Sequence, residues 1–177
     1  MLNELSDYFF SQKIYNTFAC DLNGSIEEDN LTDFNKPITH SPYLHSYNLV
    51  RLNDPFIYDW VQHIKNMTNC SSCQLQIYYP PSGFLGWHTN DDAKGYNVLL
   101  TYSKSDKSYL ETHNNKIYDK IGWSAKTNHF HGTSNWHRVI AADHRISFAF
   151  LYDTEEKSEK ALKKLQIKGV INWDNDI

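Results

Sequence analysis

The fold is decided by residues 76–92, which read QIYYPPSGFLGWHTNDD. A run rich in β-forming residues ends at a Pro-Pro-Ser-Gly break, and such a break predicts a turn. The chain then enters a second ordered segment, in which the first strong metal-binding side chain is His88. Because residues two apart on an extended segment point to the same side, we expect His88 and Asn90 to face one way. Asp91 and Asp92 follow directly, and together these groups make up most of a metal site.

Residues 145–150 support a binding site near His88. Without such support, a lone histidine after a turn is usually structural. Residues 145–150 alternate between a small, polar face and an apolar face, which predicts a strand with one packed side. The two faces are Arg145, Ser147 and Ala149 on one side and Ile146, Phe148 and Phe150 on the other. An arginine on the small face needs an anionic partner, because a buried charge is costly unless it is paired. We therefore expect Arg145 to bind a carboxylate or phosphate bidentately.

Together these residues resemble the Fe(II)- and 2-oxoglutarate-dependent oxygenases, especially the branch with the prolyl hydroxylases and the oxidative nucleic-acid demethylases. Members of that family carry a Tyr before a Pro/Gly turn, then His-x-Asp, later a second His, and then an Arg-x-Ser strand. The matching residues, within 75–152, are Tyr79, His88-Thr89-Asn90, His137 and Arg145-Ile146-Ser147. The chain departs from the family pattern at Asn90, which stands where the family places its carboxylate ligand.

The resemblance implies a mainly β fold with flanking helices, namely a double-stranded β-helix, which is a jelly roll or cupin-like barrel. A length of 177 residues predicts a single domain. Within it we expect N-terminal helices and loops over 1–70, the β-helix core over 71–152, and a C-terminal helix and tail over 153–177. Apolar residues at helical spacing predict a helix at Pro55–Asn66 that packs on the outside of the barrel. Further local patterns predict a helix over 154–165 and strands over 46–52 and 96–102.

The resemblance also implies an oxygenase that hydroxylates or oxidatively demethylates its substrate with Fe(II) and 2-oxoglutarate. His88, Asn90 and His137 would bind the metal, and His88 and His137 would be the catalytic residues. A site of this kind occupies one face of the metal and leaves the other positions for cosubstrate and O₂. Asp92 has the same parity as His88 and is the alternative ligand to Asn90.

The resemblance further implies that Arg145 binds the distal carboxylate of 2-oxoglutarate. The supporting donors would be Ser147, the hydroxyl of Tyr79, and Tyr102 on the strand over 96–102. Thr101 points to the other face of that strand and stays open as the alternative to Tyr102.

Other interpretations stay open at this stage. The main one is a catalytically lapsed β-helix module that binds a carboxylate ligand, because Asn90 brings no charge to the metal. A halogenase is disfavoured, since Asn90 is larger than the small residue that leaves room for a halide. A histidine-bound zinc or copper ion is a further alternative, but it leaves Arg145 and His88 without a role. Its ligands would be His129, His131, His137 and His144.

Composition and net charge limit the kinds of molecule that the protein is expected to bind. The formal net charge is −4 and no block of Lys or Arg occurs, so nucleic-acid binding is not favoured and a small-molecule or peptidyl substrate is expected. Three cysteines and the lack of an apolar N-terminal segment predict a reduced, cytoplasmic chain without membrane association. Cys70 and Cys73 have Cys-x-x-Cys spacing, but a structural zinc site needs four ligands. The spacing also suits a redox pair, but we interpret the two cysteines as small residues that lead into a strand.

Overall fold

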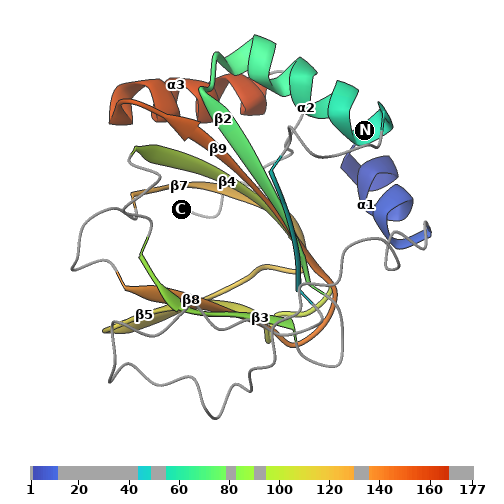
Figure 1. Ribbon diagram of the computed structural model, residues 1–177, viewed down its shortest axis with the longest axis vertical. Helices are drawn as coiled ribbons and strands as arrows, with labels where there is room; N and C mark the ends of the chain where they lie inside the picture. The colour runs from blue at the N-terminus through green and yellow to red at the C-terminus, as the bar shows by residue number, and fades with distance from the viewer. Residues whose placement is uncertain are drawn as a thin grey trace.

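The strands of the computed structural model form two antiparallel sheets, and helices cover one of them (Figure 1). The structure describes residues 2–11, 44–48, 55–78, 83–89, 95–129 and 136–167. The predicted fold class, mainly β with flanking helices, is confirmed at this level. In the described part of the chain no strand of one sheet pairs with a strand of the other, so the two sheets do not form a closed barrel.

The larger sheet has five strands, and the smaller sheet has four. In spatial order the larger sheet consists of β1 (Leu44–Asn48), β2 (Ser72–Tyr78), β9 (Arg145–Tyr152), β4 (Tyr96–Ser103) and β7 (Gly122–Asn128). The smaller sheet consists of β3 (Gly83–His88), β8 (His137–Ala141), β5 (Tyr109–Thr112) and β6 (Asn115–Tyr118). The helices are α1 (Leu2–Ser11), α2 (Pro55–Thr68) and α3 (Glu155–Ile167).

The strands from β2 to β9 pair in a nested order. Strand β2 pairs with β9, β3 with β8, β4 with β7, and β5 with β6. The pairs thus run inward from the two ends of the series. Alternate pairs therefore belong to alternate sheets. This nesting brings residues from distant parts of the sequence onto adjacent strands, and it places both predicted histidine ligands on one sheet.

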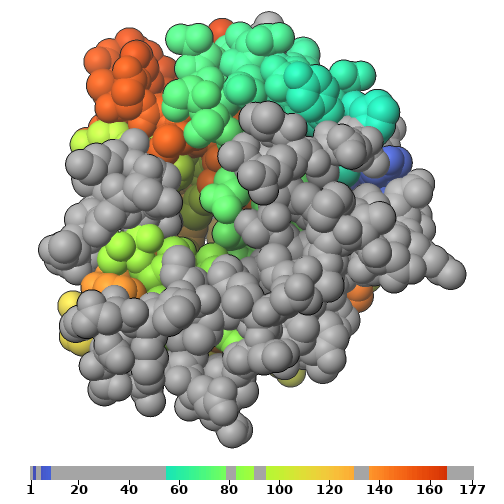
Figure 2. Space-filling view, in the orientation of Figure 1, coloured from blue at the N-terminus to red at the C-terminus, as the bar shows by residue number. Residues whose placement is uncertain are grey.

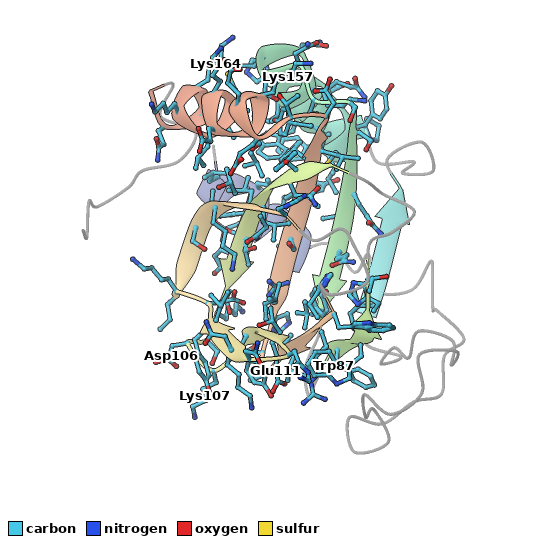
Figure 3. The ribbon with its side chains drawn as sticks, turned by 90° about the vertical axis from the view of Figure 1, so that its left-hand side faces the viewer. Trp87, Asp106, Lys107, Glu111, Lys157 and Lys164 are labelled. Carbon is cyan, nitrogen blue, oxygen red and sulfur yellow. The ribbon has the colours of Figure 1, made fainter. Side chains whose placement is uncertain are left out.

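The helices pack on the outer face of the larger sheet. Trp60 of α2 contacts Phe148 and Phe150 of β9, with ring centroids 5.0 and 6.4 Å apart. Ile146 belongs to the same buried cluster, so the apolar face predicted for residues 145–150 is confirmed. Figure 2 shows α2 and α3 side by side at one end of the molecule. In Figure 3 Lys157 and Lys164 point outward from α3, whereas Trp87 and Glu111 lie at the opposite end, on the smaller sheet.

Helix α2 confirms the helix predicted at Pro55–Asn66 and continues to Thr68. Its apolar stripe of Ile57, Trp60, Val61 and Ile64 is buried against the larger sheet. The helix ends at Asn69, whose φ of 58° is left-handed and whose N–H donates to the carbonyl of Lys65 at 2.7 Å. Asparagine tolerates that conformation better than most residues, and it therefore serves as a helix terminator here.

The start of β4 depends on a glycine. Gly95 has a φ of +147°, and a Cβ at this position would lie 2.4 Å from the carbonyl oxygen of Tyr152. Any larger residue would therefore displace β4 from β9, the strand with which it pairs along its whole length. The strand predicted over 46–52 overlaps β1, which begins two residues earlier, and its residues 49–52 lie outside the described residues. Helix α3 matches the helix predicted over 154–165. No helix in the described ranges is both long and apolar enough to span a membrane.

Candidate functional site

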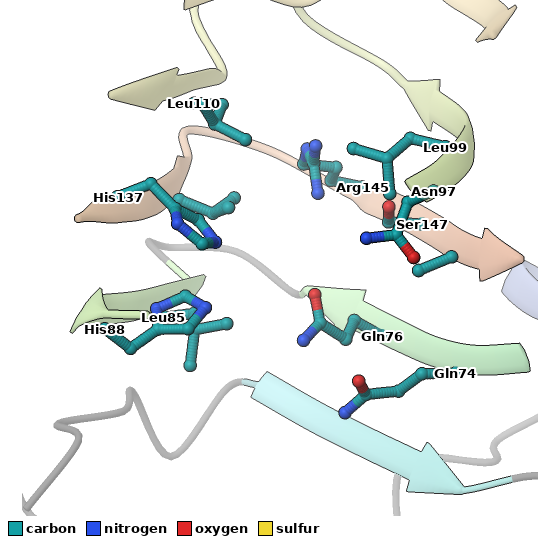
Figure 4. Close-up of a pocket in the computed structure, with 12 residues that line it drawn as sticks. Gln74, Gln76, Leu85, His88, Asn97, Leu99, Leu110, His137, Arg145 and Ser147 are labelled. Atoms are coloured by element: carbon teal, nitrogen blue, oxygen red, sulfur yellow. The ribbon is translucent and has the colours of Figure 1, made fainter. Parts of the chain in front are cut away.

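A pocket lies between the inner faces of the two sheets. The space between its lining side chains amounts to about 520 Å³, a figure that includes the open solvent at the mouth. The smaller sheet contributes two histidines and three aliphatic side chains, and the larger sheet contributes mainly polar side chains (Figure 4). The lining residues are Gln74, Gln76, Leu85, His88, Asn97, Leu99, Leu110, His137, Val139, Arg145, Ser147 and Ala149.

The two histidines predicted as metal ligands lie directly opposite each other on neighbouring strands. His88 ends β3 and His137 begins β8, and the two are cross-strand partners. Their ring centroids are 4.2 Å apart, with the ring planes tilted by 54°. Both side chains are buried, at 8% and 4% exposed. The ladder between β3 and β8 has a register irregularity between Leu85 and His88, and such irregularities commonly re-aim a side chain next to a functional site.

A backbone contact orients the His88 ring. Its Nδ1 lies 2.8 Å from the carbonyl oxygen of Gly86. Because a carbonyl only accepts hydrogen bonds, Nδ1 must carry the proton, and in the neutral ring Nε2 then carries the lone pair. This is the arrangement that metal-binding histidines commonly adopt, with one nitrogen held by a backbone carbonyl and the other available as ligand. The donor set of His88 and His137 therefore fits a divalent transition metal.

Arg145 is the most deeply buried charge of the pocket, at 2% exposed. Its Nε donates to Oδ2 of Asp119 at 2.7 Å, and its guanidinium lies 5.1 Å from the centre of the Tyr78 ring. Burial disfavours the charged guanidinium, but the Asp119 carboxylate and Tyr78 outweigh that effect and raise the pKa of Arg145. Nη1 of Arg145 is buried and has no hydrogen-bond partner within the described ranges. The sequence predicted an anionic partner for Arg145, and Asp119 is one such partner. Nη1 of Arg145 remains as a donor that Asp119 does not satisfy.

The donors expected beside Arg145 are only partly brought together. Ser147 lines the pocket as predicted, and its Oγ lies 3.5 Å from Oγ1 of Thr101. The prediction for Tyr102 was wrong. Its ring packs against Trp123 on the helix-covered face of the larger sheet, with centroids 5.4 Å apart. Side chains alternate along β4, so Thr101 rather than Tyr102 points towards the pocket.

Several predicted site residues lie outside the described residues. These are Tyr79, Asn90, Asp91 and Asp92, so the structure does not describe a third metal ligand. In the described ranges no group of three or more His, Cys, Asp or Glu side chains converges on one point. The alternative histidine cluster is not assembled there either: His129 stacks on Tyr96 and His144 contacts Asp143, while His131 is outside the described residues.

The polar lining of the larger sheet was not predicted from the sequence. Gln74 and Gln76 alternate with the buried Leu75 and Ile77, so the period of two was a usable signal for an inward polar face. No periodic pattern in the sequence marks Asp119 as a residue of the site. It follows a short exposed strand, and only the tertiary fold places it against Arg145.

Cys70 and Cys73 lie where the chain enters β2, as the interpretation of small residues leading into a strand predicts. Both thiols are free and buried in the cluster beneath the helices. Burial raises the pKa of both thiols, so they are poor nucleophiles and poor metal ligands.

Comparison with known proteins adds little to this geometry. No family model and no curated protein matches the chain. Among solved structures, the plu4264 protein from Photorhabdus luminescens is similar, with 10% identity over 73% of this chain and 91% of that chain and a TM-score of 0.34. A TM-score this low does not establish a shared fold, so the site must be judged from its own residues.

Proposed function

We propose that this protein is an Fe(II)- and 2-oxoglutarate-dependent dioxygenase built on a double-stranded β-helix. The nested strand order supports the fold, because a jelly roll consists of antiparallel strand pairs wrapped in this way into two facing sheets. The observation that carries the function is the placement of an imidazole pair and a buried arginine with an unpartnered N–H in one pocket. Fold alone would not support an activity, but these groups are those that the chemistry needs.

His88 and His137 would hold the metal, and the sequence predicts Asn90 as the third ligand. When bound, Fe(II) with 2-oxoglutarate and O₂ supplies an oxidant that can attack an unactivated C–H bond, and this chemistry belongs to the cofactors. The Gly86 carbonyl orients the His88 ring through Nδ1, so Nε2 would be the ligating nitrogen. Arg145 and Ser147 would anchor the carboxylate of the cosubstrate on the larger sheet. The apolar side chains of Leu85, Leu110 and Val139 line the pocket on the side of the smaller sheet.

The proposal is tested by anaerobic titration of the protein with Fe(II) and 2-oxoglutarate. Formation of the chelate produces a weak visible charge-transfer band, which we expect for the native chain. His88→Ala and His137→Ala should each remove the band. His113→Ala is the matched control, because His113 lies in the turn between β5 and β6, away from the pocket lining, and this variant should retain the band. No band with the native chain, or an equal band in His137→Ala, would exclude this metal site.

A second candidate function is a catalytically lapsed β-helix module that binds a carboxylate. It is favoured by one observation: the polar donors of the larger sheet, including Arg145 and Ser147, form a pocket wall that needs no metal to bind an anion. The same titration separates the two candidates when it is followed by calorimetry with 2-oxoglutarate. Binding that does not depend on Fe(II), without a visible band, would identify the module.

A further inference from the structure

The charges around Arg145 raise a question that the proposed function leaves open. Asp119 already neutralises the guanidinium through a 2.7 Å contact, and both side chains are nearly inaccessible, at 3% and 5% exposed. An incoming carboxylate would therefore meet a neutral pair, and the nearby negative charge of Asp119 would oppose it. For an anion to bind strongly beside Arg145, the pocket needs a further positive charge.

Lys126 is placed to supply that charge. It lies on β7 and is the cross-strand partner of Leu99, which lines the pocket. Cross-strand partners share one face of a sheet, so Lys126 also faces inward. The neighbouring residues on β7 confirm this parity, because Trp123 and Ala125 pack into the cluster beneath the helices on the opposite face. Lys126 is thus an inward-facing cation on the strand that borders the pocket.

The Lys126 ammonium interacts electrostatically with both Arg145 and Asp119. The side chain is partly buried and forms no hydrogen bond or ion pair with any residue that the structure describes. Burial lowers the pKa of Lys126, as does the positive charge of Arg145, whereas Asp119 raises it. The three groups together carry a net charge of about +1 when the lysine is protonated, and a bound anion would favour that protonated form.

Unpartnered donors accompany this charge. Nη1 of Arg145 and Nδ2 of Asn128 are both buried without a hydrogen-bond partner among the described residues. Asn128 lies two residues beyond Lys126 and therefore on the same face of β7. Buried donors of this kind are rarely left unsatisfied in a native protein, and a polar ligand between the sheets would satisfy them.

We propose that Lys126 and Nη1 of Arg145 together bind one carboxylate of a dicarboxylate ligand, while Asp119 positions the guanidinium. The proposal rests on the proposed function only in identifying this group as the distal carboxylate of 2-oxoglutarate. A site with two cations and one internal carboxylate should select dianionic ligands over monocarboxylates of the same length.

The test is calorimetric binding of glutarate to the metal-free chain, which requires no oxygenase chemistry. Lys126→Met should weaken glutarate binding at least tenfold, because a charge-assisted hydrogen bond is lost. Lys126→Arg should retain affinity within a few-fold. Lys163→Met removes an exposed lysine of α3 and should change nothing. A thermal melt of each variant verifies folding, and Lys126→Arg keeps the test decisive if Lys126→Met is unstable.

A comparison of 2-oxoglutarate with 2-oxovalerate tests whether Lys126 contacts the distal carboxylate. With Fe(II) present, Lys126→Met should weaken 2-oxoglutarate but leave 2-oxovalerate, which lacks the distal carboxylate, unchanged. Unaltered glutarate affinity in Lys126→Met, or no glutarate binding by the native chain, would overturn the proposal. Glutarate binding that depends on Lys126, together with no visible Fe(II) chelate, would support the dicarboxylate site and reject the oxygenase.

Discussion

The two faces of the larger sheet are built on the same strands but differ in almost every property. The face beneath α2 and α3 is apolar, and Phe148 and Phe150 are fully buried there. The face towards the smaller sheet carries Arg145, Ser147 and other polar side chains. Neighbouring residues of β9 thus serve opposite purposes, because successive side chains of a strand point to opposite sides.

This difference separates stability from function within one element. Burial of apolar area beneath the helices supplies most of the driving force for folding. The pocket face contains a buried ion pair and unpartnered donors, which contribute little to stability or oppose it. Substitutions on the two faces should therefore have separable effects.

The largest effect is expected from Phe148→Ala on the helix-covered face. Phe148 is fully buried and its ring contacts those of Trp60, Phe150 and Trp123. The cavity should lower the free energy of unfolding by about 3–5 kcal/mol, measured by urea denaturation. Ile121→Ala is the control, because Ile121 is 69% exposed and its truncation should cost no more than about 0.5 kcal/mol. Equal effects of the two substitutions would contradict the assigned core.

The next effect concerns the ion pair on the pocket face. Asp119→Asn removes the counter-charge of the buried Arg145 and should lower the free energy of unfolding by about 2–3 kcal/mol. Added glutarate should stabilise this variant more than the native chain, because the ligand replaces the missing carboxylate. Asp153→Asn breaks an ion pair whose two partners are exposed, and little change is expected. A fully stable Asp119→Asn protein would show that the pocket face tolerates an unpaired buried charge.

The proposed metal site is probed at Asn90, which the sequence predicts as the third ligand. Asn90→Asp adds the carboxylate that the family pattern carries and should tighten Fe(II) binding about tenfold, or about 1.4 kcal/mol. Anaerobic metal titration measures the change. Asp92→Ala is the comparison, and it should have little effect. Loss of metal binding in Asp92→Ala would instead make Asp92 the ligand.

The smallest effect is expected from substitutions at Thr101 and Tyr102, adjacent residues of β4 whose side chains lie on opposite faces of the larger sheet. Thr101→Val removes a hydroxyl that points towards the pocket and contacts Ser147, so 2-oxoglutarate affinity should fall about two- to tenfold. Tyr102→Phe alters the opposite face and should leave ligand affinity unchanged. Calorimetry on both variants measures the difference. The reverse result would restore Tyr102 as the cosubstrate contact.

Local patterns were sufficient to predict much of the architecture. The period of two over residues 145–150 correctly assigned both faces of β9, and helical spacing correctly located α2. The assignment of Tyr102 failed for a related reason. Periodicity shows that Thr101 and Tyr102 face opposite sides, but it does not show which side is the cavity, and a large aromatic residue suits either.

The sequence by itself predicted β4, β9, α2 and α3 and the side chains that share a face of each strand, and it supplied the residues of the proposed metal-binding and anion-binding site. These properties follow from backbone geometry and residue type over a few positions. Only the tertiary structure decided that His88 lies opposite His137, that Asp119 pairs with Arg145, and that Lys126 lies on the same face of the larger sheet as the pocket-lining Leu99. Each of these contacts joins segments far apart in the chain, and their proximity depends on strand pairing and packing of the whole domain, which no local pattern specifies.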